Sequence, residues 1–219
     1  MIKKLISTAV NGFLAGIAIS IGGALYIMTK VYTDNTVLAA ALFSIGLILV
    51  CNFGFFLYTG KICYLLDELI IKKNKGFVLE LIVGLIFNIL GATLMGLLLR
   101  NFTLMADNAA DMMYLKDLDA NMWLTLLKGI FCGLLINLAV EGYRKSETSL
   151  GKYLILVLCV AGFIVCGFEH SIADDFYIAV SGVEGNLVPL LLIILGNTIG
   201  GLIYPLLNMI ILKTNKEKM

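Results

Sequence analysis

Long apolar segments alternate with short polar connectors along the whole chain. The apolar segments fall at about 5–29, 37–66, 77–99, 122–140, 153–168 and 187–212. A helix needs about 20 mostly apolar residues to cross the roughly 30 Å hydrocarbon core of a bilayer. The pattern therefore predicts an all-α polytopic membrane protein with six transmembrane helices. Because the connectors leave no room for a separate soluble domain, residues 1–219 are taken as a single transmembrane domain.

Two of the six segments do not fit a continuous spanning helix. Residues 37–71 would form a helix much longer than the membrane is thick, and Thr59-Gly60-Lys61 interrupts them near the middle. The fifth segment is too short before it meets Glu169-His170-Ser171, yet apolar residues resume at 176–178. Irregular backbone at membrane depth persists only where it lines a cavity or is buried in protein. Spans two and five are therefore predicted to be broken helices.

The two predicted breaks occupy equivalent places in two halves of the chain, about 5–100 and 122–212. The third and sixth spans also match, since Asn88-Ile-Leu-Gly91 corresponds to Asn197-Thr-Ile-Gly200. Each half has three spans, so the halves must have opposite orientations in the membrane. Inverted repeats with paired broken helices are typical of transporters and channels, whose transport site lies at the breaks.

The composition supports a membrane protein and excludes several other classes. The chain is 60% hydrophobic and 14% charged, and its mean hydropathy is +0.99, whereas soluble domains are about 45–50% apolar and about 25% charged. A soluble enzyme, a nucleic-acid binder and a secreted disulfide scaffold are therefore excluded. The net charge of +1 suggests no polyanionic partner. The first apolar segment is too long for a cleavable signal peptide.

The positive charges predict the orientation of the spans. With six spans, eleven Lys and Arg residues fall on one side and three on the other. The first group is Lys3, Lys4, Lys72, Lys73, Lys75, Arg144, Lys145, Lys152, Lys213, Lys216 and Lys218; the second is Lys30, Arg100 and Lys116. Because Lys and Arg concentrate on the cytoplasmic side, both termini are predicted to be cytoplasmic, in the cytoplasmic membrane.

Small residues and cysteines have structural interpretations. Gly12, Gly16, Ser20 and Ala24 form a four-residue repeat on the first span, which predicts close helix packing. The cysteines lie in apolar segments without metal-ligand spacing, so we expect apolar burial of their thiols and no metal or cofactor. They are Cys51, Cys63, Cys132, Cys159 and Cys166.

The candidate chemistry lies at the breaks. His170 is the single histidine, and an ionisable residue at membrane depth is a functional candidate. Thr59 at the other break could bond an anion, bond the imidazole or cap the following half-helix. Lys61 needs a partner or a wet cavity, and Glu169, Asp174 and Asp175 are the available counter-charges. One histidine and no phosphate-binding loop argue against an intramembrane enzyme.

These residues occur in an order and spacing that resemble a known family. The matching stretches are Gly12-Phe-Leu-Ala-Gly16 with Gly22-Gly23, Leu57-Tyr-Thr-Gly60, Ile136-Asn-Leu-Ala-Val140, Gly167-Phe-Glu-His-Ser-Ile-Ala173 and Gly196-Asn-Thr-Ile-Gly-Gly201. Along essentially its whole length the chain resembles the formate/nitrite transporter family of anion channels.

The resemblance implies an aquaporin-like six-span protomer with its own pore, assembled as a homopentamer in the lipid bilayer. By motif position His170 and Thr59 would form the pore centre. The outer slit would be lined by Phe43, Leu47 and Phe163, and the inner slit by Leu57, Tyr58, Ile136 and Val157. Lys116 would correspond to a vestibule lysine.

The chain departs from the family pattern at four positions, which are Phe56, Lys61, Gly133 and Asp174. Lys61 and Asp174 stand where the family commonly has asparagine. A paired replacement would explain both, so we predict a salt bridge between Lys61 and Asp174 that joins the two breaks.

The function implied is passage of small monovalent anions, with formate first and nitrite, hydrosulfide or short carboxylates as alternatives. A bare anion is costly in an apolar slit. His170 could supply a proton so that the weak acid crosses in neutral form, or could only shape the field while the anion itself is conducted. The alternative function is a neutral-solute pore of the aquaporin or ammonia-channel type.

Overall fold

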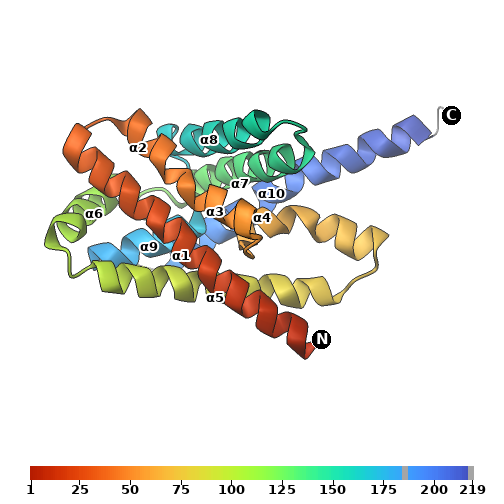
Figure 1. The fold of residues 1–219 in the computed structure, drawn as a ribbon, viewed down its shortest axis with the longest axis horizontal. Coiled ribbons are helices and arrows are strands. Elements are labelled where there is room, and N and C mark those ends of the chain that lie inside the picture. Colours follow the sequence, from red (N-terminus) through yellow and green to blue (C-terminus); the bar gives the residue numbers. More distant parts are fainter. Residues whose placement is uncertain (184–186, 217–219) are drawn as a thin grey trace.

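The computed structural model describes residues 1–183 and 187–216, and its secondary structure there is helical. The elements in chain order are α1 (Ile2–Thr33), α2 (Thr36–Phe43), α3 (Ile45–Phe53), α4 (Tyr58–Lys61), η1 (Ile62–Tyr64), η2 (Asp67–Ile71), α5 (Gly76–Leu99), α6 (Thr103–Lys116), α7 (Met122–Lys145), α8 (Ser149–Val165), α9 (Ser171–Ser181) and α10 (Leu187–Lys216). Figure 1 shows most of the long helices running roughly along the long axis of the molecule.

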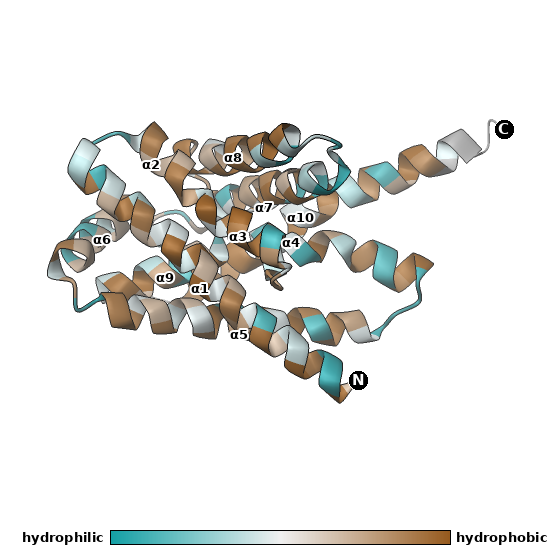
Figure 2. Ribbon diagram, viewed as in Figure 1, coloured by the Kyte–Doolittle hydropathy of each residue, from teal (hydrophilic) through white to brown (hydrophobic). Residues whose placement is uncertain are grey.

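The predicted six-span helical architecture is confirmed. Within the described residues, five segments are long and apolar enough to cross a membrane: α1, α2 with α3, α5, α7 and α10. The shorter apolar helix α8 is the sixth. Hydrophobic residues cover the middle of these helices, and hydrophilic residues gather toward the ends of the molecule (Figure 2).

The second and fifth spans are broken, as predicted, but the first break lies earlier than expected. Helix α3 ends at Phe53, Gly54 has a φ of +70°, and α4 begins only at Tyr58. Thr59-Gly60-Lys61 therefore lies in the first turn after the break. At the second break α8 ends at Val165, and Gly167 has a φ of +68°. Glycine adopts this left-handed conformation at little cost, which ends each helix.

Two buried asparagines hold the chain at the breaks in the same way. Asn88 of α5 accepts a hydrogen bond from the Tyr58 N–H (2.7 Å) and donates to the carbonyls of Gly12 and Phe56 (both 2.8 Å). Asn197 of α10 accepts from the Ser171 N–H and donates to the carbonyls of Gly129 and Glu169 (all 2.9 Å). Each amide thus ties its broken span to two neighbouring helices. These matching contacts support the division into two inverted repeats.

Glycines bring the paired helices into close contact. A Cβ on Gly16 would lie 2.2 Å from the Asn88 carbonyl oxygen of α5, and one on Gly200 would lie 1.9 Å from the Ile130 carbonyl oxygen of α7. Gly12, Gly16 and Ser20 are buried while Ala24 is half-buried, so the predicted close packing of the first span is confirmed. Small residues let backbones approach closely where the hydrophobic effect does not drive helices together.

Gly200→Ala is expected to destabilise the fold, because the added methyl group would collide with the backbone of α7. Overpacking of this kind typically costs about 1–3 kcal/mol. Gly162→Ala on α8 is the matched control, since its Cβ would meet no atom of the described residues within 4 Å. It should be neutral or stabilising by about 0.5–1 kcal/mol. Thermal unfolding in detergent measures both; equal melting temperatures would contradict this packing.

Helix α6 is an element that the sequence analysis did not predict, because its polar composition suggested a connector. It packs against α9, and Met105, Met112 and Met113 contact the central core around buried Ala109. Met105, Ala109 and Met112 recur at helical spacing, so periodicity could have revealed it. Its last residue, Lys116, thereby lies beside α9.

The thiols only partly follow the expectation of burial. Cys63, Cys132 and Cys159 are buried, Cys51 is half-buried and Cys166 is exposed at the second break. All five are free cysteines.

Candidate functional site

The first turns after the two breaks meet in the centre of the molecule. Thr59 Oγ1 of α4 lies 2.8 Å from His170 Nε2, which is at the start of α9. Both side chains are buried, with 0% and 2% exposure. Of the three roles considered for Thr59, the structure shows the contact with the imidazole; α4 has no side-chain cap.

The hydrogen bonds of His170 define a neutral imidazole. Its Nδ1 accepts a hydrogen bond from the Ala173 N–H (3.3 Å), so the side chain caps α9. A nitrogen that accepts cannot carry a proton, which places the hydrogen on Nε2. Nε2–H then donates to Thr59 Oγ1. The hydroxyl of Thr59 is left with a hydrogen that it can donate to a passing solute.

The residues predicted for the outer slit surround the imidazole on one side. The Phe163 ring stacks on His170 with centroids 5.9 Å apart and planes at 25°. Phe43 meets Phe163 edge-on, with a centroid distance of 6.1 Å. Phe43, Phe163 and Leu47 are all buried in the central cluster. The structure therefore gathers this predicted set, although its role as a slit stays a proposal.

The four residues predicted for the inner slit have different surroundings. Leu57 and Ile136 are buried in the central cluster. Tyr58 packs in a separate cluster with Phe56 and Phe77, and its hydroxyl is 2.8 Å from Thr198 Oγ1 of α10. Leu57 is the extended residue before α4 and Tyr58 is the first residue of that helix, and their side chains lie in different clusters. The role of Tyr58 in the inner slit stays a prediction.

Val157, the fourth predicted residue, is half-buried and is not part of the cluster of Leu57 and Ile136. Its role in the slit also stays a prediction. Val140 lines the same cavity as Leu57 and lies one turn after Ile136 on α7. The i, i+4 spacing of Ile136 and Val140, which puts them on one helix face, was the signal for it.

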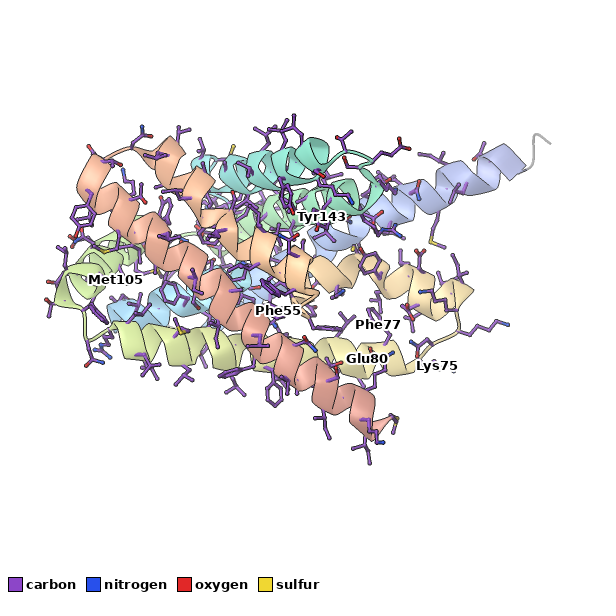
Figure 3. The ribbon with its side chains drawn as sticks, viewed as in Figure 1. Phe55, Lys75, Phe77, Glu80, Met105 and Tyr143 are labelled. Atoms are coloured by element: carbon purple, nitrogen blue, oxygen red, sulfur yellow. The ribbon has the colours of Figure 1, made fainter. Side chains whose placement is uncertain are left out.

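Cavities open on both sides of the Thr59–His170 contact. One cavity, about 280 Å³, reaches Phe43, Phe163 and His170 and also holds Lys116 and Lys128; we name it the outer cavity after the predicted outer slit. The inner cavity, about 180 Å³, reaches Leu57 and is lined by Lys61 and Arg144. Phe55 and Tyr143, labelled in Figure 3, also line the inner cavity. Both cavities therefore combine apolar walls with cations.

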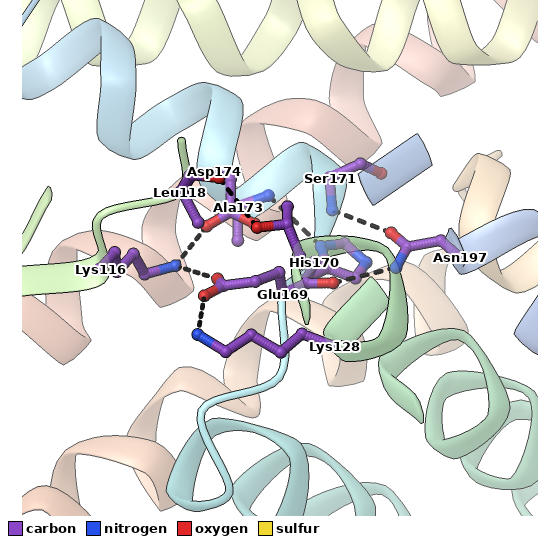
Figure 4. Close-up of polar contacts among 10 residues, drawn as sticks. Lys116, Leu118, Lys128, Glu169, His170, Ser171, Ala173, Asp174 and Asn197 are labelled. Atoms are coloured by element: carbon purple, nitrogen blue, oxygen red, sulfur yellow. Dashed lines mark hydrogen bonds and ion pairs between the residues drawn. The ribbon is translucent and has the colours of Figure 1, made fainter. Parts of the chain in front are cut away.

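An ionic cluster lies in the outer cavity beside His170 (Figure 4). Lys116 Nζ bonds both Glu169 Oε2 and Asp174 Oδ1. Lys128 Nζ lies 3.6 Å from Glu169 Oε1. Burial alone would lower the pKa of Lys116, but Asp174 and Glu169 outweigh it and raise this pKa, so the ammonium stays charged.

The predicted salt bridge between Lys61 and Asp174 is wrong. Asp174 pairs with Lys116 in the outer cavity, whereas Lys61 lines the inner cavity. Lys61 Nζ lies 5.9 Å from the ring centroids of Phe56 and Tyr64. Lys116, the last residue of α6, pairs with Asp174 in place of Lys61.

The separation of Lys61 from Asp174 predicts additive effects. Lys61→Met removes an inner cation and Asp174→Asn removes an outer carboxylate, so the double variant should change the transport rate by the product of the two single effects. Distant sites without shared partners usually add to within about 0.5 kcal/mol. Flux measured in all four proteins tests this, and a larger interaction would indicate direct contact.

Known proteins resemble this chain over nearly its full length. A family model described as formate/nitrite transporter matches residues 2–211. The chain belongs to the formate/nitrite transporter family. A probable formate transporter of Methanothermobacter thermautotrophicus is 27% identical, covering 89% of this chain and 84% of that protein. The formate channel FocA of Escherichia coli K12 is 29% identical, covering 80% of this chain and 66% of that protein.

Solved structures show the same fold. A pentameric formate channel with formate bound superposes with a TM-score of 0.78 at 24% identity, covering 91% of this chain and 93% of that one. A formate/nitrite-family ion channel gives a TM-score of 0.80 at 24% identity, covering 93% and 89% of the two chains. The protein is accordingly a multi-pass membrane channel or transporter, not an enzyme.

Two departures from the formate/nitrite family pattern have structural reasons. At Gly133 a Cβ would lie 2.3 Å from the Asn197 carbonyl oxygen, so close packing of α7 on α10 requires glycine. Phe56 packs against Phe77, with centroids 6.5 Å apart, and fills the space left by Gly84, where a Cβ would lie 2.4 Å from the Phe56 ring.

Proposed function

We propose that the protein carries formate, or another small monovalent anion, across the cytoplasmic membrane together with a proton. The observation that carries the proposal is the buried Thr59–His170 pair, placed between two cavities that each contain cations. Nitrite, hydrosulfide and short carboxylates share the charge and size of formate and are the next candidates. The relatives named as formate channels support formate as the first choice.

The electrostatics of this path favour an acid that crosses in neutral form. Lys61 in the inner cavity attracts an anion, and Lys116 and Lys128 in the outer cavity do so against the opposing charges of Glu169 and Asp174. The free energy needed to desolvate a bare anion between Phe43, Phe163 and Leu57 would be far larger than the attraction of these cations at that depth. A protonated acid crosses at lower cost, and at the centre it can accept a hydrogen bond from the Thr59 hydroxyl.

We propose an orientation of the molecule from its charges. In Figure 1 the start of α1, the described end of α10, the turn between η2 and α5 and the connector between α7 and α8 lie toward one end of the molecule. These segments carry the larger set of Lys and Arg residues. We take this end as cytoplasmic, so the cavity with His170 opens outward.

A homopentamer is the proposed assembly. It is supported by the pentameric formate channel of the same fold and by the apolar outer faces of the spans. On α5, for example, Ile82, Ile86 and Leu90 are each about half exposed. The mass of the detergent-solubilised protein, measured by native mass spectrometry, tests the assembly.

Flux into proteoliposomes that contain a pH-sensitive dye tests the proposed substrate. Formate, nitrite and hydrosulfide are added in parallel, with protein-free vesicles as the control. Fast uptake of one anion with acidification of the interior is expected. Flux of water or ammonia, without anion uptake, would instead indicate a neutral-solute pore.

A further inference from the structure

Asp174 has an unused acceptor in the outer cavity. It lies one turn after His170 on α9, and its backbone N–H donates to the His170 carbonyl (2.9 Å). Its side chain is 1% exposed and lines the cavity that holds His170. Oδ1 pairs with Lys116, whereas Oδ2 is buried and has no hydrogen-bond partner in the part of the chain that the structure describes.

A buried carboxylate oxygen without a donor is an unfavourable arrangement. Leaving such an acceptor unpaired costs free energy, and the cost is greater when the group is charged. A proton on Oδ2 would remove the negative charge and turn the oxygen into a donor. His170 has no unpaired nitrogen, because both ring nitrogens make hydrogen bonds in the neutral form. The atom that can accept a proton is therefore Oδ2 of Asp174.

The charges around Asp174 explain when that proton would bind. The groups that face it or its partners are Lys116 of α6, Glu169 at the break and Lys128 of α7, together with the neutral side chains of His170, Cys132, Tyr26 and Tyr177. With both acids ionised, two cations balance two anions. An entering anion makes this cluster negative overall, and one bound proton restores neutrality. Charge balance matters because Coulomb energies are large where water is scarce.

We propose that Asp174 binds the proton that is carried with the anion. Oδ2 of the carboxylate takes a proton from hydronium that reaches it through the outer cavity, which leaves a water molecule, and becomes a carboxylic acid. It then gives this proton to the arriving anion, which leaves toward Thr59 and His170 as the neutral acid, and Asp174 returns to the carboxylate. This inference rests on the proposed transport of a weak acid and names the group that supplies the proton.

The test compares two adjacent aspartates. Asp174→Asn keeps an oxygen for Lys116 but cannot hold an acidic proton. Asp175→Asn is the matched control: Asp175 is also buried, but its carboxylate bonds Thr93 of α5 (3.0 Å) and does not line the outer cavity. The half-saturation concentration for formate is measured in proteoliposomes at external pH values from about 5 to about 8. One linked proton raises it by up to about tenfold per pH unit.

We expect this dependence in the wild type and in Asp175→Asn, and a half-saturation concentration nearly independent of pH in Asp174→Asn. An unchanged pH dependence in Asp174→Asn would overturn the assignment. Absence of formate transport in the wild type would instead count against the proposed function. A second measurement that needs no transport is the infrared difference spectrum on acidification. It should show a carboxylic-acid band that shifts with ¹³C-labelled aspartate, persists in Asp175→Asn and disappears in Asp174→Asn; an aspartate-insensitive spectrum would overturn the proposal.

Discussion

His170→Asn is expected to reduce formate flux by about tenfold or more. Asparagine is among the best N-cap residues, so it can replace the bond from the Ala173 N–H that His170 Nδ1 accepts. It offers no second ring nitrogen to Thr59, and the Thr59 hydroxyl loses the orientation that the 2.8 Å contact gives it. Loss of one such polar contact with a solute in transit is worth about 1–3 kcal/mol. The measurement is the initial rate of formate uptake into proteoliposomes at equal protein density.

Two variants of Thr59 separate the hydroxyl from the shape of the side chain. Thr59→Ser retains Oγ and should keep most of the flux, whereas Thr59→Val is nearly isosteric and should lose it as His170→Asn does. If His170→Asn and Thr59→Val both conduct formate like the wild type, the pair does not lie on the path.

Asn197→Leu is expected to have the largest effect on stability. The side chain of Asn197 satisfies one buried N–H and two buried carbonyls, at Ser171, Gly129 and Glu169. Leucine has a similar volume but leaves these groups without the amide, at a cost of about 1–3 kcal/mol for the N–H alone. A total loss of about 3 kcal/mol would lower the melting temperature by about 10 °C.

Asn88→Leu should give a loss of similar size, because Asn88 makes the equivalent three bonds at the other break. Asn101→Leu is the control, since Asn101 is exposed and its side chain donates to the Leu98 carbonyl within the same turn of the chain. Thermal unfolding in detergent compares the three variants. Equal melting temperatures for Asn197→Leu and Asn101→Leu would show that the amide clamps do not hold the breaks.

The architecture could be predicted where the membrane itself sets the rule. Span length and the opposite orientation of three-span halves follow from bilayer thickness, and Asn88 and Asn197 marked the equivalent helices before any contact was known. The position of the first break was predicted less accurately from the sequence. Gly54, with its positive φ, ends α3, whereas the more polar Thr59-Gly60-Lys61 suggested a later interruption. Helix α6 was missed because its many polar residues resemble a connector.

The sequence predicted the part of the site in which two residues meet across the breaks. It did not predict contacts that depend on the rotation of a helix or on the path of a connector. Thr59 and His170 meet as expected from their equivalent positions. Tyr58 and Val157 lie outside the cluster of Leu57 and Ile136, because the face that each residue presents depends on helix rotation. Lys61 and Asp174 were paired only by charge. Lys116, on the unpredicted helix α6, reaches Asp174 instead.

The pH dependence of formate flux, measured together with proton movement in proteoliposomes, tests the central claim most directly. Passage as the neutral acid predicts that the initial rate falls steadily from about pH 5 to about pH 8, because the proton needed for crossing becomes scarce. It also predicts about one proton carried per formate. A rate that is unchanged over this range, with formate moving down an electrical gradient and no proton, would show that the pore conducts the bare anion and would contradict the account.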